Sequence, residues 1–257
     1  MSLAVLQNGH LASGCANGTI QIWNTSDGTL IANITGHTDK VQSLVVLRNG
    51  FLASGSADAT IKIWNPFNAS LDLVRNLTGH TNVVFALAVL QNGYLASGSQ
   101  DFTIKIWNAD NGTLARTLTG HTGWVRALTV LKNGYLVSGG SDFTTMIWNA
   151  TEGSLIRTLI GQNSTIMAYA ELPNGHLAVG SRDFTVKIWN TNTGSLISTL
   201  IGHTLPLRAL AMLPNGYLAS GSVDATIKIW NTDNYGLIRS LEGHNDSVLS
   251  LTVLLVI

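Results

Sequence analysis

Short apolar runs alternate with turn-forming polar residues along the whole chain. In the second copy of this pattern, the runs are Val41–Leu47, Leu52–Ser56, Thr60–Trp64 and Leu71–Leu77. Asn49-Gly50 separates the first two runs, and an Asn-Gly pair is a strong signal for a tight β-hairpin. No helical period extends over a window of about 11 residues, so the pattern predicts four short strands joined by turns.

This four-strand pattern occurs six times. An Ile-Trp-Asn triplet marks the third strand of each copy, with its tryptophan at Trp23, Trp64, Trp107, Trp148, Trp189 and Trp230. The spacings are 41, 43, 41, 41 and 41 residues. The longer spacing comes from Asn65-Pro66-Phe67-Asn68, which we interpret as a longer turn around a locally buried Phe67. A fixed period of this length predicts one repeated unit that buries itself against its neighbours.

Each copy reads roughly GHT-xxVxxLxVLxNGxLASGSxDxTIKIWN-xxxGxLIRTL and in this form resembles the WD repeat. The resemblance covers residues 2–254 and implies an all-β fold, a WD40 β-propeller of six four-stranded blades in a single domain, 1–257. Every copy has Asn where the family name expects Asp after the tryptophan, and Asn can form the same turn.

Residues 247–254 repeat the first strand once more, which predicts one extra inner strand. This strand has two possible roles. It completes the first blade and closes a six-bladed ring, with His244 meeting Ser13, Asn17 and Trp23, or the chain is a fragment of a seven-bladed or longer array. We favour closure, because the apolar ending would promote aggregation if it were unpaired.

The resemblance implies a buried hydrogen-bonded set of His, Ser, Asp and Trp in most blades, since all four side chains can then be satisfied. The expected sets are His37, Ser54, Asp58 and Trp64; His80, Ser97, Asp101 and Trp107; His121, Ser138, Asp142 and Trp148; and His203, Ser220, Asp224 and Trp230. In the fifth copy Gln162 and Val179 replace His and Ser together, whereas losing one partner alone would leave a buried group unpaired. Because the set is repeated, we interpret it as structural and expect no catalytic residue.

The composition narrows the class of partner. With 14 basic and 14 acidic residues the net charge is zero, so nothing favours membranes or nucleic acid in general. Cys15 is the only cysteine, which excludes a disulfide framework, and we expect neither a metal nor another cofactor. The start of the chain does not resemble a signal peptide. Nine Asn-x-Ser/Thr sequences are interpreted as turns, which favours a cytoplasmic protein with the nucleus left open.

Charged residues also recur on the outer strands. We interpret Arg75, Arg116, Arg157 and Arg239 on the fourth strands, and Lys62, Lys105, Lys187 and Lys228 on the third, as solvated edge charges. Such charges discourage edge-to-edge association of sheets.

WD-repeat proteins commonly bind partners on the face where the second-to-third and fourth-to-first loops emerge. The resemblance places on this face the positions three and five residues after each histidine and one before each aspartate. The candidate partner-binding residues there are Lys40, Phe85, Trp124, Arg126, Met167, Arg182 and Arg208. Trp and Arg are enriched at binding hot spots, and the three arginines suit an acidic or phosphorylated peptide.

These observations predict a non-catalytic scaffold that mediates protein–protein interactions, as a monomeric subunit of a larger complex. One alternative is an RNA-binding propeller that uses Trp124 and the arginines for stacking and phosphate contact. A propeller hydrolase is the weaker alternative, because Glu171 is the one acid inside an inner strand. The sequence does not identify the partner.

Overall fold

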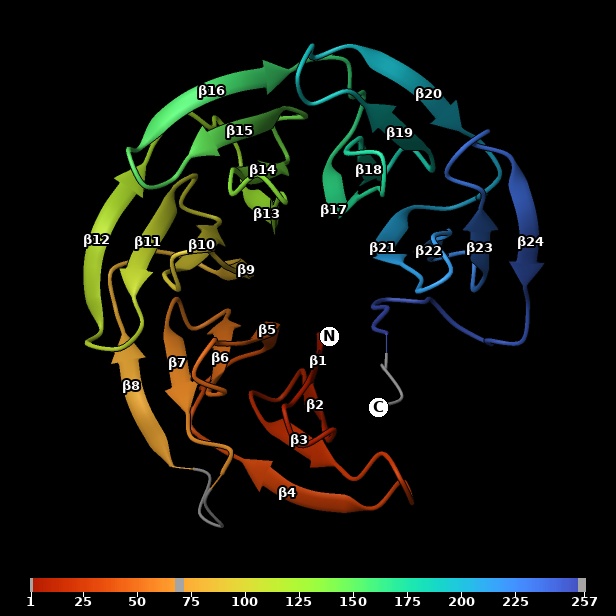
Figure 1. Cartoon of the computed structure of the whole chain (residues 1–257). Coiled ribbons are helices and arrows are strands. Elements are labelled where there is room, and N and C mark those ends of the chain that lie inside the picture. Colours follow the sequence, from red (N-terminus) through yellow and green to blue (C-terminus); the bar gives the residue numbers. More distant parts are fainter. Residues whose placement is uncertain (1, 68–71, 254–257) are drawn as a thin grey trace. The chain divides into compact units, whose positions relative to one another are not determined.

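Every regular element of the chain is a β-strand in the computed structural model, which describes residues 2–67 and 72–253. The strands form six four-stranded sheets, and in each sheet the strand order follows the chain (Figure 1). The prediction of an all-β fold with six four-stranded blades is therefore confirmed. No helix in the described part of the chain is long and apolar enough to cross a membrane.

One unit of the structure extends to residue 130, and a second unit begins at residue 131. The first unit holds β1 (Leu3–Val5), β2 (Leu11–Gly14), β3 (Ile20–Trp23), β4 (Leu30–Ile34), β5 (Val41–Val46), β6 (Leu52–Ser56), β7 (Ile61–Trp64), β8 (Leu73–Leu77), β9 (Val84–Val89), β10 (Leu95–Ser99), β11 (Ile104–Asn108), β12 (Thr113–Leu118) and β13 (Val125–Val130). The observed β5 to β8 agree with the four predicted runs to within about two residues, which is the usual uncertainty of element ends.

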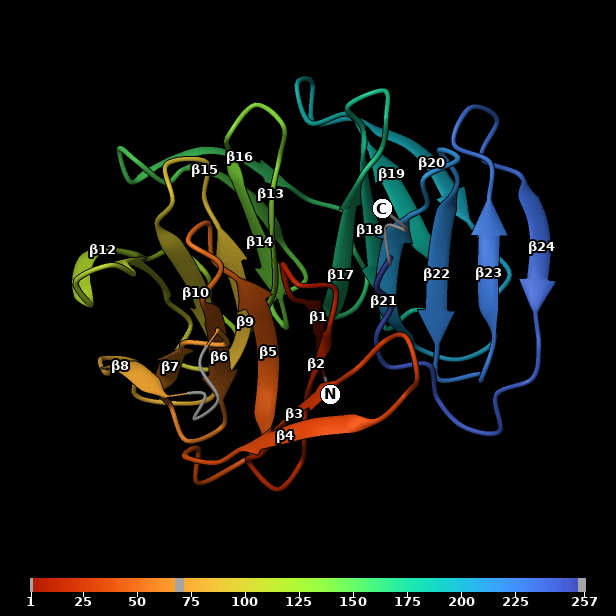
Figure 2. The ribbon, with the colours of Figure 1, turned by 60° about the horizontal axis from the view of Figure 1, so that its bottom comes forward.

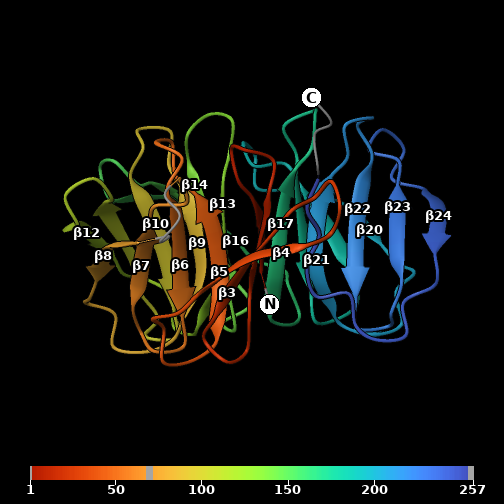
Figure 3. The same ribbon diagram turned by 90° about the horizontal axis from the view of Figure 1, so that it is seen from below.

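The second unit holds β14 (Leu136–Gly140), β15 (Thr145–Asn149), β16 (Ser154–Leu159), β17 (Ile166–Glu171), β18 (Leu177–Ser181), β19 (Val186–Trp189), β20 (Leu196–Leu200), β21 (Leu207–Met212), β22 (Leu218–Ser222), β23 (Ile227–Trp230) and β24 (Leu237–Leu241). Neighbouring strands of a blade run in opposite directions, as in the pairs β21–β22, β22–β23 and β23–β24. The β22–β23 turn and the segment after β24 therefore leave the sheet at the same end (Figure 2, Figure 3).

The Asn-Gly turn between β5 and β6 shows how the sequence sets a hairpin. Gly50 has a φ of 84°, a left-handed conformation that glycine adopts at little cost. Asn49 Oδ1 accepts the N–H of Phe51 at 3.0 Å, and Leu47 N–H donates to the carbonyl of Phe51 at 2.8 Å. The turn is thus fixed by local hydrogen bonds before any tertiary contact is needed.

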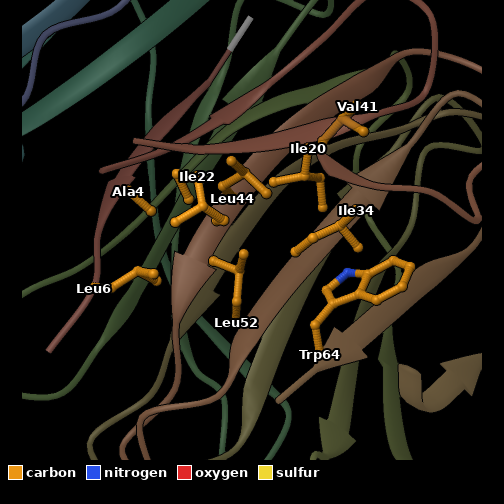
Figure 4. Packing of buried hydrophobic residues seen from close by; sticks show 10 residues of the cluster. Ala4, Leu6, Ile20, Ile22, Ile34, Val41, Leu44, Leu52 and Trp64 are labelled. Carbon is orange, nitrogen blue, oxygen red and sulfur yellow. The ribbon is translucent and has the colours of Figure 1, made fainter. Parts of the chain in front are cut away.

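Neighbouring blades pack through apolar side chains of their inner strands. In the first unit, Ile20 and Ile22 of the first blade lie in one buried cluster with Val41, Leu44 and Leu52 of the second (Figure 4). The free energy of folding comes largely from removing such side chains from water.

A glycine in the second strand of a blade lets the next blade approach. A Cβ at Gly14 would lie 2.7 Å from Val41 Cγ1, and one at Gly55 would lie 2.8 Å from Val84 Cγ1. In the second unit a Cβ at Gly221 would lie 2.7 Å from Val248 Cγ1. The repeated Ser-Gly of the sequence is therefore a packing requirement between blades.

The outer arginines do more than face solvent. Arg75 Nε donates to the carbonyl of Asp110 in the following blade at 2.9 Å. In the second unit Arg157 donates to the carbonyls of Asn192 and Thr193 at 2.9 and 3.1 Å. Each of these two side chains thus fastens a turn of the next blade.

The interpretation of the third-strand lysines as solvated charges is wrong at two positions. Lys62 and Lys187 are only 8% and 7% exposed. Lys62 Nζ donates to Asn76 Oδ1 at 3.0 Å, and Lys187 Nζ donates to the carbonyl of Gly161 at 3.0 Å. These hydrogen bonds satisfy the ammonium groups where the sheet covers their stems.

The predicted extra strand at 247–254 is not formed in its described part, residues 247–253. Val248 still occupies the position of a first-strand residue, because it is buried and donates its N–H to the carbonyl of Ser222 at 2.9 Å. A strand also requires a ladder of hydrogen bonds with a second strand, and these residues take part in none. Closure of a ring involves both units and stays a prediction.

The insertion in the second blade also differs from its prediction. Phe67 is 56% exposed, although its ring lies against Phe51 with centroids 6.4 Å apart. Asn65 stabilises the turn, because its Oδ1 accepts the N–H of Phe67 at 2.9 Å. The turn therefore does not require a buried phenyl group. Asn68 lies outside the described residues.

Candidate functional site

Four side chains of the second blade form one hydrogen-bonded set, which we call the tetrad. Trp64 Nε1 on β7 donates to Ser54 Oγ on β6 at 2.8 Å. Ser54 Oγ lies 2.7 Å from Nε2 of His37, and Nδ1 of His37 lies 2.7 Å from Asp58 Oδ2. Ser54 is fully buried, so its hydroxyl serves the blade and is closed to a substrate.

A neutral His37 protonated on Nδ1 satisfies every member of the tetrad. The serine then donates to Nε2, and Nδ1–H donates to the carboxylate of Asp58. Burial lowers the pKa of His37 below its ordinary value of 6.5, and the hydrogen bond to Asp58 opposes only part of this effect. Burial alone would raise the pKa of Asp58, but hydrogen bonds from Thr60 and His37 outweigh it and lower the pKa to about 2.

The third and sixth blades repeat this geometry. His80 lies 2.7 Å from both Asp101 and Ser97, and His203 lies 2.8 Å from Asp224 and 2.7 Å from Ser220. Trp107 and Trp230 each donate to their serine at 2.8 Å.

The first and fourth blades show parts of the set. In the fourth blade Trp148 Nε1 donates to Ser138 Oγ at 2.8 Å. These two residues and Asp142 belong to the second unit, whereas the buried His121 belongs to the first. In the first blade Trp23 donates to Ser13 at 2.9 Å, while Asn17 accepts from Thr19 in its own turn.

The fifth blade carries an incomplete set. Val179 is fully buried in place of the serine, and Trp189 Nε1 is buried without a hydrogen-bond partner among the described residues. Both polar atoms of the Gln162 amide are also buried and have no partner in the part of the chain that the structure describes. Losing His and Ser together therefore left unpaired groups. Lys187 remains within 3.4 Å of Asp183.

A polar pair in the second unit was missed by the sequence analysis. The hydroxyl of Tyr169 on β17 lies 3.0 Å from Thr145 Oγ1 on β15 in a buried position. A Cβ at Gly139 would lie 2.1 Å from that hydroxyl, so the glycine makes room for it. The available signal was that Tyr169 and Thr145 both replace apolar residues of the repeat.

The candidate partner-binding residues of the first unit include a preformed cluster. The rings of Phe85 and Trp124 have centroids 6.0 Å apart. The guanidinium carbon of Arg126 lies 4.3 Å from the Phe85 centroid and 4.7 Å from the Trp124 centroid. Trp124 is 36% exposed, so the cluster reaches the surface. Packing and cation–π attraction hold its three side chains in place. We call these residues the aromatic–arginine cluster.

Two arginines of the second unit form a like-charged pair. Arg208 is half-buried on β21, and its Nε is buried without a hydrogen-bond partner in the described residues. Burial lowers the pKa of Arg208, and the positive charge of Arg182 lowers it further. Arg182 itself is exposed in the β18–β19 turn.

The other two candidates differ in exposure. Lys40 is exposed just before β5 in the first unit, and Met167 is half-buried on β17 in the second. Arg126 belongs to the first unit and Arg182 and Arg208 belong to the second, so the expectation that the three arginines together suit an acidic or phosphorylated peptide stays a prediction.

Three phenylalanines in the turns between second and third strands were not predicted as surface residues. Phe102, Phe143 and Phe184 have φ angles of 70°, 62° and 72° and are 43%, 44% and 39% exposed. A left-handed conformation costs roughly 1–2 kcal/mol in a residue with a side chain. The sequence signal was their place directly after the tetrad aspartate.

Glu171, the acid considered for hydrolysis, has a structural contact. Its Oε2 accepts the backbone N–H of Lys132 at 2.7 Å. The carboxylate therefore braces the hairpin of the preceding blade.

The chain matches the family described as WD domain, G-beta repeat in six places. The matched residues are 1–24, 28–65, 71–108, 112–149, 153–190 and 194–231, which together cover most of the chain. No curated protein matches it.

Proposed function

Because this chain belongs to the WD-repeat family, we propose that it is a non-catalytic scaffold that holds other proteins together. The contact surface is the turn-rich face that carries Lys40, Phe85, Trp124, Arg126, Met167, Arg182 and Arg208. The scaffold acts as a monomeric subunit of a larger complex in the cytoplasm or the nucleus.

The aromatic–arginine cluster is the observation that carries this proposal. Trp124 and Arg126 are of types enriched at hot spots, and Phe85 is of a type enriched in interface cores. The three side chains lie against one another. A preordered surface loses less conformational entropy on binding than a flexible one. Trp124 is also the one tryptophan outside the repeated Ile-Trp-Asn triplets, so the repeat does not require it.

The chemistry of the face favours acidic or phosphorylated segments of a partner. Its candidate residues include four basic side chains and no acidic one. Arginine pairs with carboxylate or phosphate through two parallel hydrogen bonds, which gives both attraction and orientation.

Affinity capture tests the proposal with a matched control. Trp124→Ala with Phe85→Ala removes the exposed part of the cluster, whereas Leu114→Ala removes an apolar side chain that is 44% exposed on β12. Partners should be lost from the first variant and kept by the control, provided that both variants unfold at the urea concentration of the wild type. Identical partners in all three samples would refute the proposed contact surface.

An RNA-binding propeller remains the second candidate, because Trp124 and Arg126 also suit base stacking and phosphate contact. Binding of single strands should then weaken steeply as salt is raised. A single-stranded RNA that is retained in a Trp124-dependent and salt-dependent manner would replace protein binding as the primary function.

A further inference from the structure

The pair of Arg182 and Arg208 has no apparent structural purpose. Arg182 directly follows β18 and Arg208 lies on β21, and these two strands pack closely, since a Cβ at Gly180 would lie 3.7 Å from Leu207 Cβ. The positive charge of Arg182 disfavours that of Arg208. A buried donor without a partner costs free energy, and Arg208 Nε is such a donor. Arg157 differs from Arg208 in this respect, because its guanidinium donates to two carbonyls of the next blade.

An anion would correct both defects. It would accept the hydrogen bond that Arg208 Nε lacks and would place a negative charge beside two positive ones. A phosphomonoester at neutral pH carries a charge of roughly −1.5 to −2 and has three acceptor oxygens. It therefore matches two guanidinium groups better than one carboxylate does.

Phe184 stands two residues after Arg182 in the same turn. The turn imposes a left-handed conformation at this position in six blades, with Gly18 in the first, and Ala59 and Ala225 occupy it in two others with φ angles of 66° and 63°. Alanine therefore suffices for the turn. The phenyl group of Phe184 is 39% exposed, so it is not needed to fill the core.

We infer that Arg182 and Arg208 form a subsite for the phosphoryl group of a phosphorylated peptide, with Phe184 contacting an apolar residue beside the phosphorylated one. The inference rests on the proposed binding function of the face and names the chemistry of the ligand. The occupant is a peptide, because a phosphate contact joined to an exposed phenyl group suits a chain with mixed polarity.

A peptide pool provides the test. One pool has a fixed phosphoserine between randomised positions, a second has glutamate at the fixed position, and a third has serine. The wild type should retain the phosphoserine pool and select apolar residues beside the fixed position. Equal retention of the glutamate pool, or retention of no pool, would overturn the inference.

Variants separate the roles of the residues. Arg208→Lys keeps the charge but removes Nε and the fork, so retention should fall about tenfold. Phe184→Ala copies the residue of two other blades and should abolish the apolar selection while the phosphoserine preference remains. Arg239→Gln removes an exposed charge on β24 and should change nothing. An equal loss in this control would show a nonspecific charge effect and contradict the subsite.

Inorganic phosphate gives a second measurement that does not require a peptide. The ¹⁵N resonance of Arg208 Nε should shift saturably with phosphate, and Arg182→Gln should weaken this binding about tenfold. Acetate at equal ionic strength should leave the resonance in place. If phosphate fails while partner capture still depends on Trp124, the subsite is wrong and the proposed function stands.

Discussion

At the scale of single residues, the tetrad explains why one blade sequence can be repeated so faithfully. In the second blade the donors and acceptors of His37, Ser54 and Asp58 match one another, so polar groups are buried without leaving one unpaired. The fifth blade shows the consequence of departing from the set, because Trp189 and Gln162 keep buried polar atoms that find no partner within residues 2–67 and 72–253.

Restoring the fifth set should stabilise the protein. Val179→Ser with Gln162→His gives Trp189 Nε1 an acceptor and should raise the free energy of unfolding by about 1–3 kcal/mol. Val179→Ala is the matched control, because it removes apolar atoms without adding an acceptor and should lower that free energy by about 2 kcal/mol. Urea unfolding measures both. A double variant no more stable than the control would show that the orphaned groups cost nothing.

Acid should destabilise the protein in a range where few other groups titrate. Folding lowers the pKa of His37, His80 and His203 below 6.5, so the unfolded chain binds protons first as the pH falls. The stabilisation is complete above about 6.5, the pKa of an unfolded histidine, and is lost as the pH falls through the folded-state values. Asp58, whose pKa is lowered from 3.8 to about 2, extends the loss to lower pH.

Urea midpoints at neutral pH and at a pH between the histidine and carboxylate ranges would measure this loss. The midpoint should be lower in acid, and His80→Gln should reduce the difference because it removes one buried titrating group. His244→Gln is the control, since His244 is exposed. An unchanged midpoint for the wild type would contradict the neutral state assigned to the tetrad histidines.

At the scale of elements, the contact between blades depends on a small residue facing a branched one. Gly55→Ala should lower the free energy of unfolding by about 1–3 kcal/mol, because the new Cβ meets Val84 Cγ1. Val84→Ala removes that atom, so the double variant should lose less than the two single losses added together. Strict additivity in urea unfolding would show that the two residues do not meet.

Sequence patterns predicted the elements well because both of their causes are local. Alternating apolar runs and Asn-Gly turns set the strands, and the repeat period set the blades. The burial of Lys62 could not be predicted, since it depends on Asn76 on the neighbouring strand. The exposure of Phe67 could not be predicted either, since it depends on how the inserted turn packs against Phe51. Residues 247–253 have the sequence pattern of a strand but do not form one, because a strand also needs a hydrogen-bonded neighbour.

The candidate site was predictable only where the repeat itself pointed to it. Trp124 and Arg182 stood out because they vary at positions where the frame is fixed. Their chemistry became visible only in three dimensions, as the stacking of Arg126 on two rings and as the orphaned Nε of Arg208. The exposed phenylalanines were missed because their left-handed conformation is a property of the backbone.

At the scale of the whole molecule, six copies of one unit supply the repeated blades, and in the proposed function the variable turns supply recognition. This division predicts where a substitution acts. Changes in the tetrads or in the glycine contacts should alter the free energy of unfolding, whereas changes at Trp124 or Phe184 should alter binding and leave unfolding nearly unchanged.

Site-directed photo-crosslinking tests the central claim, a partner-binding face, most directly. A photoreactive phenylalanine analogue would replace Trp124 in one sample and the exposed Leu114 of β12 in the other, followed by irradiation in cells. The account predicts a discrete crosslinked protein from position 124 that is absent from position 114. The same products from both positions, or a discrete product from position 114 alone, would contradict it.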